Sequence, residues 1–217
     1  MATREQKIRH YSAAAFAAAL LVATVYLGPR LAKESHKQNE YNKERNAKYV
    51  QTLHERELPT IDEPETYVVI ADHDVFGADA FENLVKRQGV RKNNRYILQS
   101  GDPKKDGRPT EDNMDATFKH LNGLVDNNDT VIFYAAAHGS KSGNDHVMHF
   151  GDWELTSSRI RDYFSTMEEG QGIIMLESCF SAHTDKALKG LENVTRVYSS
   201  RSNELSWTKH GEPGGRG

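Results

Sequence analysis

The feature that most constrains this fold is the alternation of short apolar runs with segments of helical periodicity after residue 64. Helical spacing of apolar residues predicts helices over 78–89, 113–125 and 156–168. Between them, runs rich in β-branched residues predict strands over 66–72, 95–100, 130–140, 172–178 and 195–200. Strands that are apolar on both faces and alternate with helices predict an α/β fold, with a mostly parallel sheet covered on both sides.

Four of the five expected strands end in polar residues. The four endings read Asp72-His73-Asp74, His138-Gly139-Ser140, Glu177-Ser178-Cys179 and Ser199-Ser200-Arg201. Because parallel strands end at one edge of a sheet, where ligands bind in such folds, we expect these side chains to gather there.

Cys179 is the only cysteine of the chain, so no disulfide forms within it. A nearby imidazole can take the proton of a thiol during attack, and His138 lies 41 residues earlier (179 − 138), one crossover away. The alternative to a nucleophilic role is that Cys179 is simply a small apolar side chain buried in the core. The His-Gly at another strand end favours a nucleophile. The N–H groups of Gly139 and Cys179 could form an oxyanion hole, and Asp74 could orient His138.

Three segments together resemble the legumain family of cysteine peptidases, in the caspase-like clan. They are HGS after VIFYAAA, ESCFSAH after GIIML and YSSRSNE after TRV. The resemblance covers residues 64–217, and the Gln-Ala-Cys-x-Gly signature of caspases proper is absent. It implies a caspase-like α/β/α sandwich and a cysteine endopeptidase, which hydrolyses peptide bonds of proteins through a Cys-His dyad and a thioester.

The resemblance also implies roles for individual residues. Cys179 would be the nucleophile, His138 the general base and acid, and Gly139 an oxyanion donor, with Asp74 orienting the histidine. Substrate binding would fall to Glu177, Ser199 and Ser200. The chain departs from the family pattern at Ala137, Ser178 and Ala182. The family's arginine after the first strand has no match, which leaves the residue preferred before the cleaved bond open.

Two other functions remain open. The catalytic subunit of the GPI-anchor transamidase has a similar fold and site, and there an amine replaces water. A caspase-like module that binds partners without catalysis is favoured by an apparently incomplete C-terminus, because the chain stops at GEPGGRG where relatives continue. The presence of both Cys179 and His138 argues against it.

The segment before the expected domain divides in two. Residues 12–28 carry no charge and approach the length of a bilayer span, so residues 1–30 are expected to hold a cytosolic tip and a transmembrane helix. The alternatives are a cleaved signal peptide and a buried Ala-rich helix. Residues 26–30, directly after the apolar run, form a poor signal-peptidase site, which argues against cleavage. Basic residues flank both ends, and we expect a single-pass protein with its catalytic domain on the non-cytoplasmic side. Residues 31–63 read as a charged helical spacer or a processed pro-segment.

Charge and metal-ligand patterns limit the partners. With 28 Lys and Arg against 31 Asp and Glu, the chain lacks the basic balance of a nucleic-acid-binding protein. His146, His149 and Asp152 have zinc-like spacing only on a helix, whereas HVMHFGDW reads as a hairpin or loop. We expect no metal cofactor, although Asp72, Asp74 and Asp79 could hold calcium if they are not ordinary loop acids. His183 is expected to face solvent, and Trp153 and Trp207 to serve packing.

Overall fold

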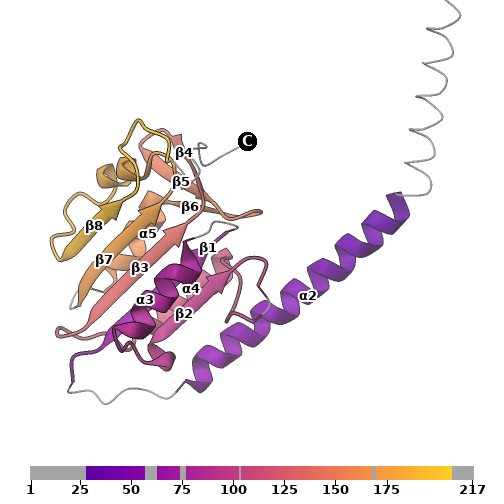
Figure 1. Ribbon diagram of the computed structural model, residues 1–217, viewed down its shortest axis with the longest axis horizontal. Coiled ribbons are helices and arrows are strands. Elements are labelled where there is room, and N and C mark those ends of the chain that lie inside the picture. The colour runs from indigo at the N-terminus through magenta and orange to yellow at the C-terminus, as the bar shows by residue number, and fades with distance from the viewer. Residues whose placement is uncertain (1–27, 57–62, 74–76, 103, 168–169, 207–217) are drawn as a thin grey trace, which may run out of the picture. The chain divides into compact units, whose positions relative to one another are not determined.

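The computed structural model describes residues 28–56, 63–73, 77–102, 104–167 and 170–206. In this part of the chain, five parallel strands form one sheet in the order β2-β1-β3-β7-β8 (Figure 1). They are β1 Thr66–Asp72, β2 Arg95–Gln99, β3 Thr130–Ala136, β7 Gln171–Glu177 and β8 Val194–Tyr198. The expected α/β fold with a parallel sheet is confirmed.

A small antiparallel sheet lies beyond the carboxyl end of β3. It consists of β4 His138–Ser142, β5 Asp145–His149 and β6 Glu154–Thr156. The run predicted as one strand over 130–140 is therefore two strands, because the chain leaves the main sheet after Ala136. The segment read as a hairpin or loop is the second arm of the β4–β5 hairpin.

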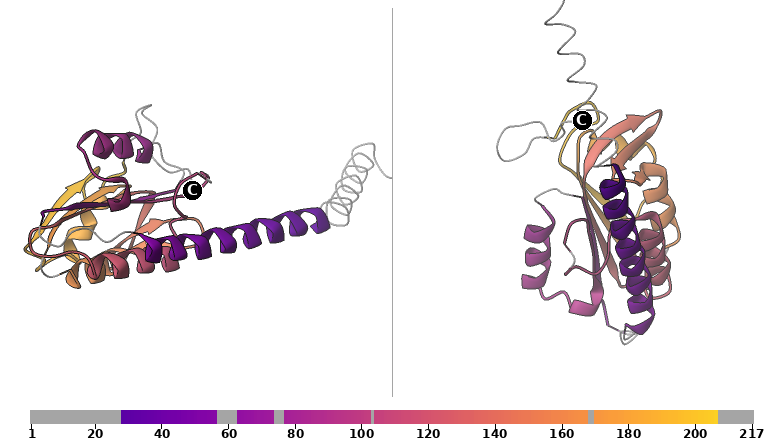
Figure 2. Two further views of the ribbon diagram at one scale, coloured as in Figure 1. Left: turned by 90° about the horizontal axis from the view of Figure 1, so that it is seen from below. Right: turned by 90° about the vertical axis from the view of Figure 1, so that its right-hand side faces the viewer.

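Helices cover both faces of the parallel sheet (Figure 2). They are α2 Gly28–Glu55, α3 Ala78–Arg87, α4 Glu111–Asn122 and α5 Ser157–Ser165, with the 3₁₀ turns η2 Lys92–Asn94 and η3 Ser181–Lys186. Thr110 and Thr156 precede α4 and α5, and their hydroxyls accept hydrogen bonds from the first-turn N–H groups of Asn113 and Arg159. Both capped helices begin within two residues of their predicted starts.

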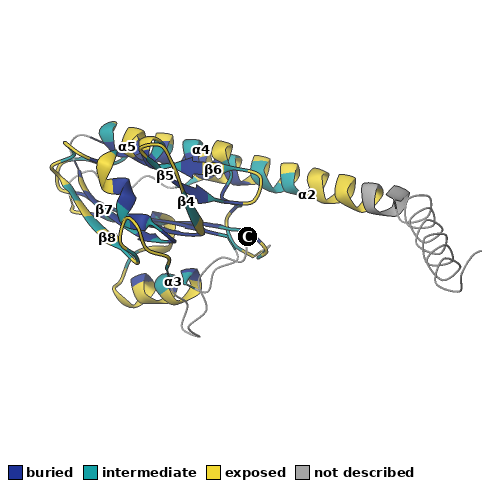
Figure 3. Ribbon diagram, turned by 90° about the horizontal axis from the view of Figure 1, so that it is seen from above, coloured by how far each residue is buried: buried dark blue, intermediate teal, exposed yellow. Residues whose placement is uncertain are grey.

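Side chains of β1 show how the two faces are filled. Tyr67, Val69 and Ala71 point into a large core shared with α4 and α5, whereas Val68 and Ile70 point into a smaller core under α3. Figure 3 shows the central strands mostly buried and α3 largely exposed on its outer side. The side of the sheet that α3 covers therefore buries fewer side chains than the opposite side.

The second half of α2 belongs to the globular domain. The compact unit begins at Arg45, and Tyr49 and Leu53, one helical turn apart, are 1% and 2% exposed in the large core. The hydroxyls of Tyr49 and Thr117 lie 2.7 Å apart. A domain boundary at residue 64 is therefore too late, since a solvated spacer would leave both apolar side chains in water. Residues 33–44 are mostly exposed, as expected of a charged helix.

Several predictions fall outside the described residues. They include the apolar run over 12–28 except for Gly28, as well as Asp74, Trp207 and the last residues of the chain. Among the helices that the structure describes, none combines the length and apolar character needed to cross a bilayer. Trp153 is half-buried and stacks on Phe150, which confirms its packing role.

Candidate active site

The expected histidine and cysteine follow neighbouring strands at the same height of the sheet. Ala136 of β3 pairs with Glu177 of β7, and the N–H of Ala137 donates to the Glu177 carbonyl at 3.2 Å. His138 and Cys179 each come two residues after this pair. Since paired strands lie about 4.8 Å apart, the register brings the two segments together at the carboxyl edge.

Gly139 packs directly against the backbone of the segment that carries Cys179. A methyl group at its Cα would lie 2.2 Å from the Cys179 carbonyl oxygen and 3.0 Å from Cβ of Ser178. Only glycine therefore fits without moving the backbone around Cys179. The glycine at this position therefore has a packing reason, and its predicted part as an oxyanion donor stays a prediction.

Cys179 lies in a tightly held loop, Ser178–Thr184, here called the cysteine loop. The cysteine is 5% exposed, and the next residue, Phe180, has a left-handed backbone with φ of 60°. This conformation is uncommon for a bulky residue, and such strain clusters at functional sites. The N–H of Phe180 donates to the Glu204 carbonyl at 2.8 Å, and the Lys141 ammonium lies 4.8 Å from the centre of its ring. These contacts hold the strained residue in place.

Both serines assigned to substrate binding bond to the backbone of the cysteine loop. The Ser199 hydroxyl accepts from the N–H of Ser178 at 3.1 Å. The Ser200 hydroxyl donates to the Ser178 carbonyl at 2.9 Å and accepts from the N–H of Ser181 at 3.0 Å. The two serines thus position the loop that carries the thiol. Their predicted part in a specificity pocket stays a prediction.

His146 of β5 packs against the cysteine loop and is fully buried. Its Nε2 lies 3.1 Å from the Cys179 carbonyl and 3.0 Å from the Ser178 hydroxyl, and its Nδ1 lies 3.0 Å from the Thr184 hydroxyl. Because a carbonyl only accepts, Nε2 carries the proton, and Nδ1 accepts from Thr184. Burial lowers the pKa of His146 to about 4, against a smaller opposing effect of the Cys179 carbonyl, so the ring is neutral at pH 7.

The histidines considered for zinc point to opposite faces of the hairpin. His146 faces the cysteine loop, whereas the Nε2 of His149 lies 2.8 Å from the Ser140 hydroxyl and its Nδ1 lies 3.2 Å from the Glu154 carboxylate. Asp152 is exposed in the loop after β5. The three residues therefore do not converge, as the hairpin reading predicted.

His138 begins the hairpin β4–β5, residues 138–149, here called the histidine hairpin. It pairs across the hairpin with His149 and is exposed to solvent. Within the described residues its imidazole makes no hydrogen bond. Its expected orienting partner, Asp74, lies outside those residues, so this assignment stays a prediction.

Glu177 accepts a short hydrogen bond from the Tyr134 hydroxyl on the α3 side of the sheet. Gly77, just before α3, packs over both groups, because a methyl group there would lie 2.6 Å from the Glu177 carboxylate. Burial, together with this carboxylate, raises the pKa of Tyr134, so the phenol stays protonated and donates. A role for Glu177 in substrate binding remains a prediction.

Two of the three acids considered for calcium are engaged separately, and the third, Asp74, lies outside the described residues. Asp72 is buried and accepts from the Gln99 amide at 3.0 Å, whereas Asp79 pairs with the Lys105 ammonium at 2.8 Å. No cluster of three or more metal-ligating side chains occurs among the residues that the structure describes.

The expectation that His183 faces solvent is wrong. It is 7% exposed, because η3 folds its ring inward beside the histidine hairpin. Sequence reasoning gave no role to His73, whose Nδ1 lies 2.8 Å from the Ser100 hydroxyl at the same sheet edge, and none to Tyr134. The available signal for His73 was its place directly after β1. For His146 the sequence offers no such signal, because Val147 and Met148 beside it are both apolar and β5 shows no alternation that would indicate the direction of its side chain.

A comparison of the chain with protein-family models and with curated proteins finds no match.

Proposed function

We propose that this chain is a legumain-like cysteine endopeptidase that cleaves protein or peptide substrates. The observation that carries the proposal is the contact of Gly139 with the backbone of Cys179, across two strands in register. It joins a His-Gly segment to a strained loop with the only thiol of the chain. Two sequence motifs 41 residues apart thereby become one candidate centre.

In the proposed reaction, the Cys179 sulfur attacks the carbonyl carbon of the substrate while the His138 imidazole takes the thiol proton. The carbonyl oxygen becomes an oxyanion that the N–H groups of Gly139 and Cys179 stabilise. When the C–N bond breaks, His138 gives its proton to the leaving amine, and a thioester forms on Cys179. Water, deprotonated by His138, then releases the acid and restores the thiol.

The supporting residues fit a reaction at a fixed sulfur. His146, Ser199 and Ser200 satisfy the backbone groups on either side of Cys179, so the loop would not need to reorganise during attack. Electrostatic stabilisation of this kind depends on donors that are in place beforehand. The uncharged run over 12–28 would tether the enzyme to a membrane, a part of the proposal that rests on sequence alone.

The first test compares the full chain with Cys179→Ala on a fluorogenic peptide library that varies the residue before the cleaved bond. We expect turnover by the wild type that the variant lacks. Since the chain has one cysteine, alkylation by iodoacetamide reports on Cys179 alone. A folded protein that neither cleaves any peptide nor reacts with iodoacetamide near pH 7 would favour the binding module instead. A product containing an added amine in place of water would favour the transamidase.

A further inference from the structure

A cavity of about 530 Å³ opens at the amino end of β2, away from the carboxyl edge that carries Cys179. Its walls are the last turn of α2, helix α3, strand β2 and residues 104–106. Three carboxylates line it, against six cationic side chains: Arg56, Lys86, Lys92, Arg95, Lys104 and Lys105. The volume is that of a small-molecule site, and its lining is positive although the whole chain carries a net charge of −3.

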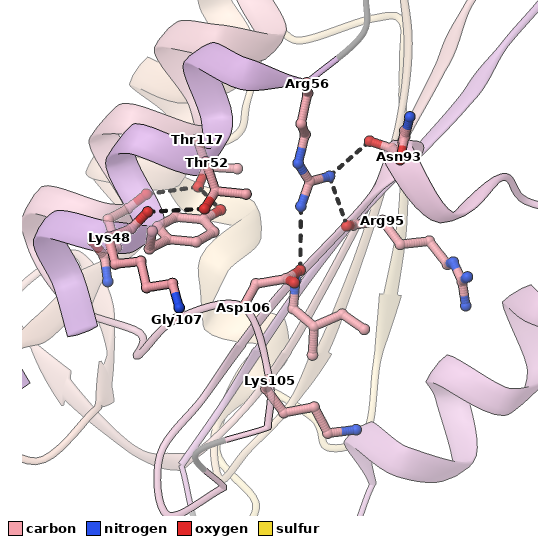
Figure 4. Close-up of polar contacts among 12 residues, drawn as sticks. Lys48, Thr52, Arg56, Asn93, Arg95, Lys105, Asp106, Gly107 and Thr117 are labelled. Carbon is pink, nitrogen blue, oxygen red and sulfur yellow. Dashed lines mark hydrogen bonds and ion pairs between the residues drawn. The ribbon is translucent and has the colours of Figure 1, made fainter.

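Three of the six cations build the wall. Lys86 and Lys105 both pair with the Glu82 carboxylate, which lies 2.5 Å from the Lys105 ammonium. Figure 4 shows Arg56 donating to the carbonyl oxygens of Asn93 and Arg95, at 2.7 and 2.9 Å, and pairing with Asp106. These contacts fix the end of α2 and the loop after β2 around the cavity.

The other three cations have no such partner within the described residues. The guanidinium of Arg95 points away from Arg56 in Figure 4, and its Nε and Nη1 are buried without a hydrogen bond. Lys92 and Lys104 are exposed and form no ion pair in the part of the chain that the structure describes. A buried donor without an acceptor is costly, so an anion that accepted from Arg95 would be stabilised there.

The lining also restricts the chemistry of the ligand. It contains no aromatic ring on which a base could stack, and its apolar surface comes from Ile97 and the stems of the lysines. An arginine fork matches the oxygens of a phosphate or a carboxylate. We propose that the cavity binds a compact polyanion with two or more phosphate or carboxylate groups, held by Arg95 inside and by Lys92 and Lys104 at the mouth. This proposal does not rest on the peptidase function.

Calorimetric titration of the full chain with inorganic tripolyphosphate and, separately, with citrate tests the site at constant ionic strength. We expect saturable binding of at least one of them, while sulfate at matched ionic strength does not compete. Arg95→Gln should weaken the affinity about tenfold or more, because a charge-assisted hydrogen bond is lost. Arg87→Gln is the matched control, since it removes the same charge from the exposed side of α3 outside the cavity. Its affinity should equal that of the wild type.

Thermal unfolding separates a binding role of Arg95 from a structural one. Tripolyphosphate should raise the unfolding temperature of the wild type but not that of Arg95→Gln. Without ligand, the variant should be at least as stable as the wild type, because two unsatisfied buried donors are removed. If Arg95→Gln does not fold, a double variant that replaces the exposed Lys92 and Lys104 by Gln tests the site instead. Its affinity for tripolyphosphate should be about tenfold weaker than that of the wild type. No saturable binding, equal affinities of the Arg95 and Arg87 variants, or equal competition by sulfate would overturn the proposal.

Discussion

The cysteine loop and the histidine hairpin meet at one sheet edge, yet they are held in opposite ways. The cysteine loop is buried, and hydrogen bonds from His146 and Ser200 fix its backbone on either side of Cys179. His138 is exposed and makes no hydrogen bond with another described residue. In the proposed reaction the sulfur therefore starts from a fixed position, whereas contact with the substrate completes the placement of the imidazole.

Among the variants that test this contrast, His138→Ala should have the largest effect on activity. Activity should fall about 10³-fold, the loss typical of a general acid-base residue. The free energy of unfolding should change by less than about 0.5 kcal/mol, because the side chain removed is exposed and makes no hydrogen bond with another described residue. Measurement of kcat/KM beside urea unfolding checks both. His149→Ala removes the imidazole directly across the hairpin and should keep most of the activity. Equal losses in the two variants would contradict the assignment.

Gly139→Ala should damage both segments at once. The added methyl group would lie 2.2 Å from the Cys179 carbonyl oxygen, so one backbone must move. We expect unfolding to become easier by about 1–3 kcal/mol, as for other overpacked sites, with a loss of activity beyond what stability explains. Gly123→Ala is the control, because its nearest atom would be an ordinary 3.5 Å away. If Gly139→Ala unfolds like the wild type, the segments are not in contact.

Acid should loosen the cysteine loop through His146. The folded pKa of about 4 lies below the ordinary 6.5, so the unfolded chain binds more protons between these values. The contribution of the neutral, buried His146 ring to the free energy of unfolding is present in full above pH 6.5. About 3 kcal/mol of it is lost as the pH falls to 4. His146→Gln keeps a donor but does not titrate. Urea unfolding at pH 7 and pH 4 should show a smaller acid loss in this variant, and identical losses would count against the buried neutral ring.

The smallest effects should come from the two serines. Ser200→Ala removes two hydrogen bonds to the backbone of the cysteine loop and should lower the free energy of unfolding by about 1–2 kcal/mol. Ser199→Ala should cost less than about 1 kcal/mol, because Ser199 is exposed and water can replace its hydroxyl. Urea unfolding of both variants shows which substitution lowers the free energy of unfolding more. A larger cost for Ser199→Ala would reverse our view of which serine fixes the loop.

Much of the fold was predictable because its strands are short, apolar and separated by helical periodicity. The strand over Thr66–Asp72 was predicted with its observed bounds, and α4 and α5 begin within two residues of the predicted helices over 113–125 and 156–168. The second half of α2 was missed, since Tyr49 and Leu53 are only two apolar residues in a charged segment. Their burial depends on a core made by distant parts of the chain.

The site was predictable only as far as the strand ends reveal it. Register alone brings His138, Gly139 and Cys179 to one edge. The support from His146 was not visible, because its partners Ser178 and Thr184 are 32 and 38 residues away in the sequence. The inward turn of His183 likewise depends on how η3 packs, which local composition does not determine.

The loop after β2 also bears on how copies of this protein behave together. β2 is one edge of the parallel sheet, and there the N–H of Gln99 donates to the Gly107 carbonyl at 2.9 Å. Arg45 clamps this segment by donating from one nitrogen to the carbonyls of Asp102 and Gly107, at 2.6 and 2.9 Å. An unpaired edge invites strand addition by another molecule, and here part of the ladder is already occupied. Strand addition at residues 97–99 would first require the Arg45 clamp to open, so Arg45 disfavours pairing with another molecule along this part of the edge.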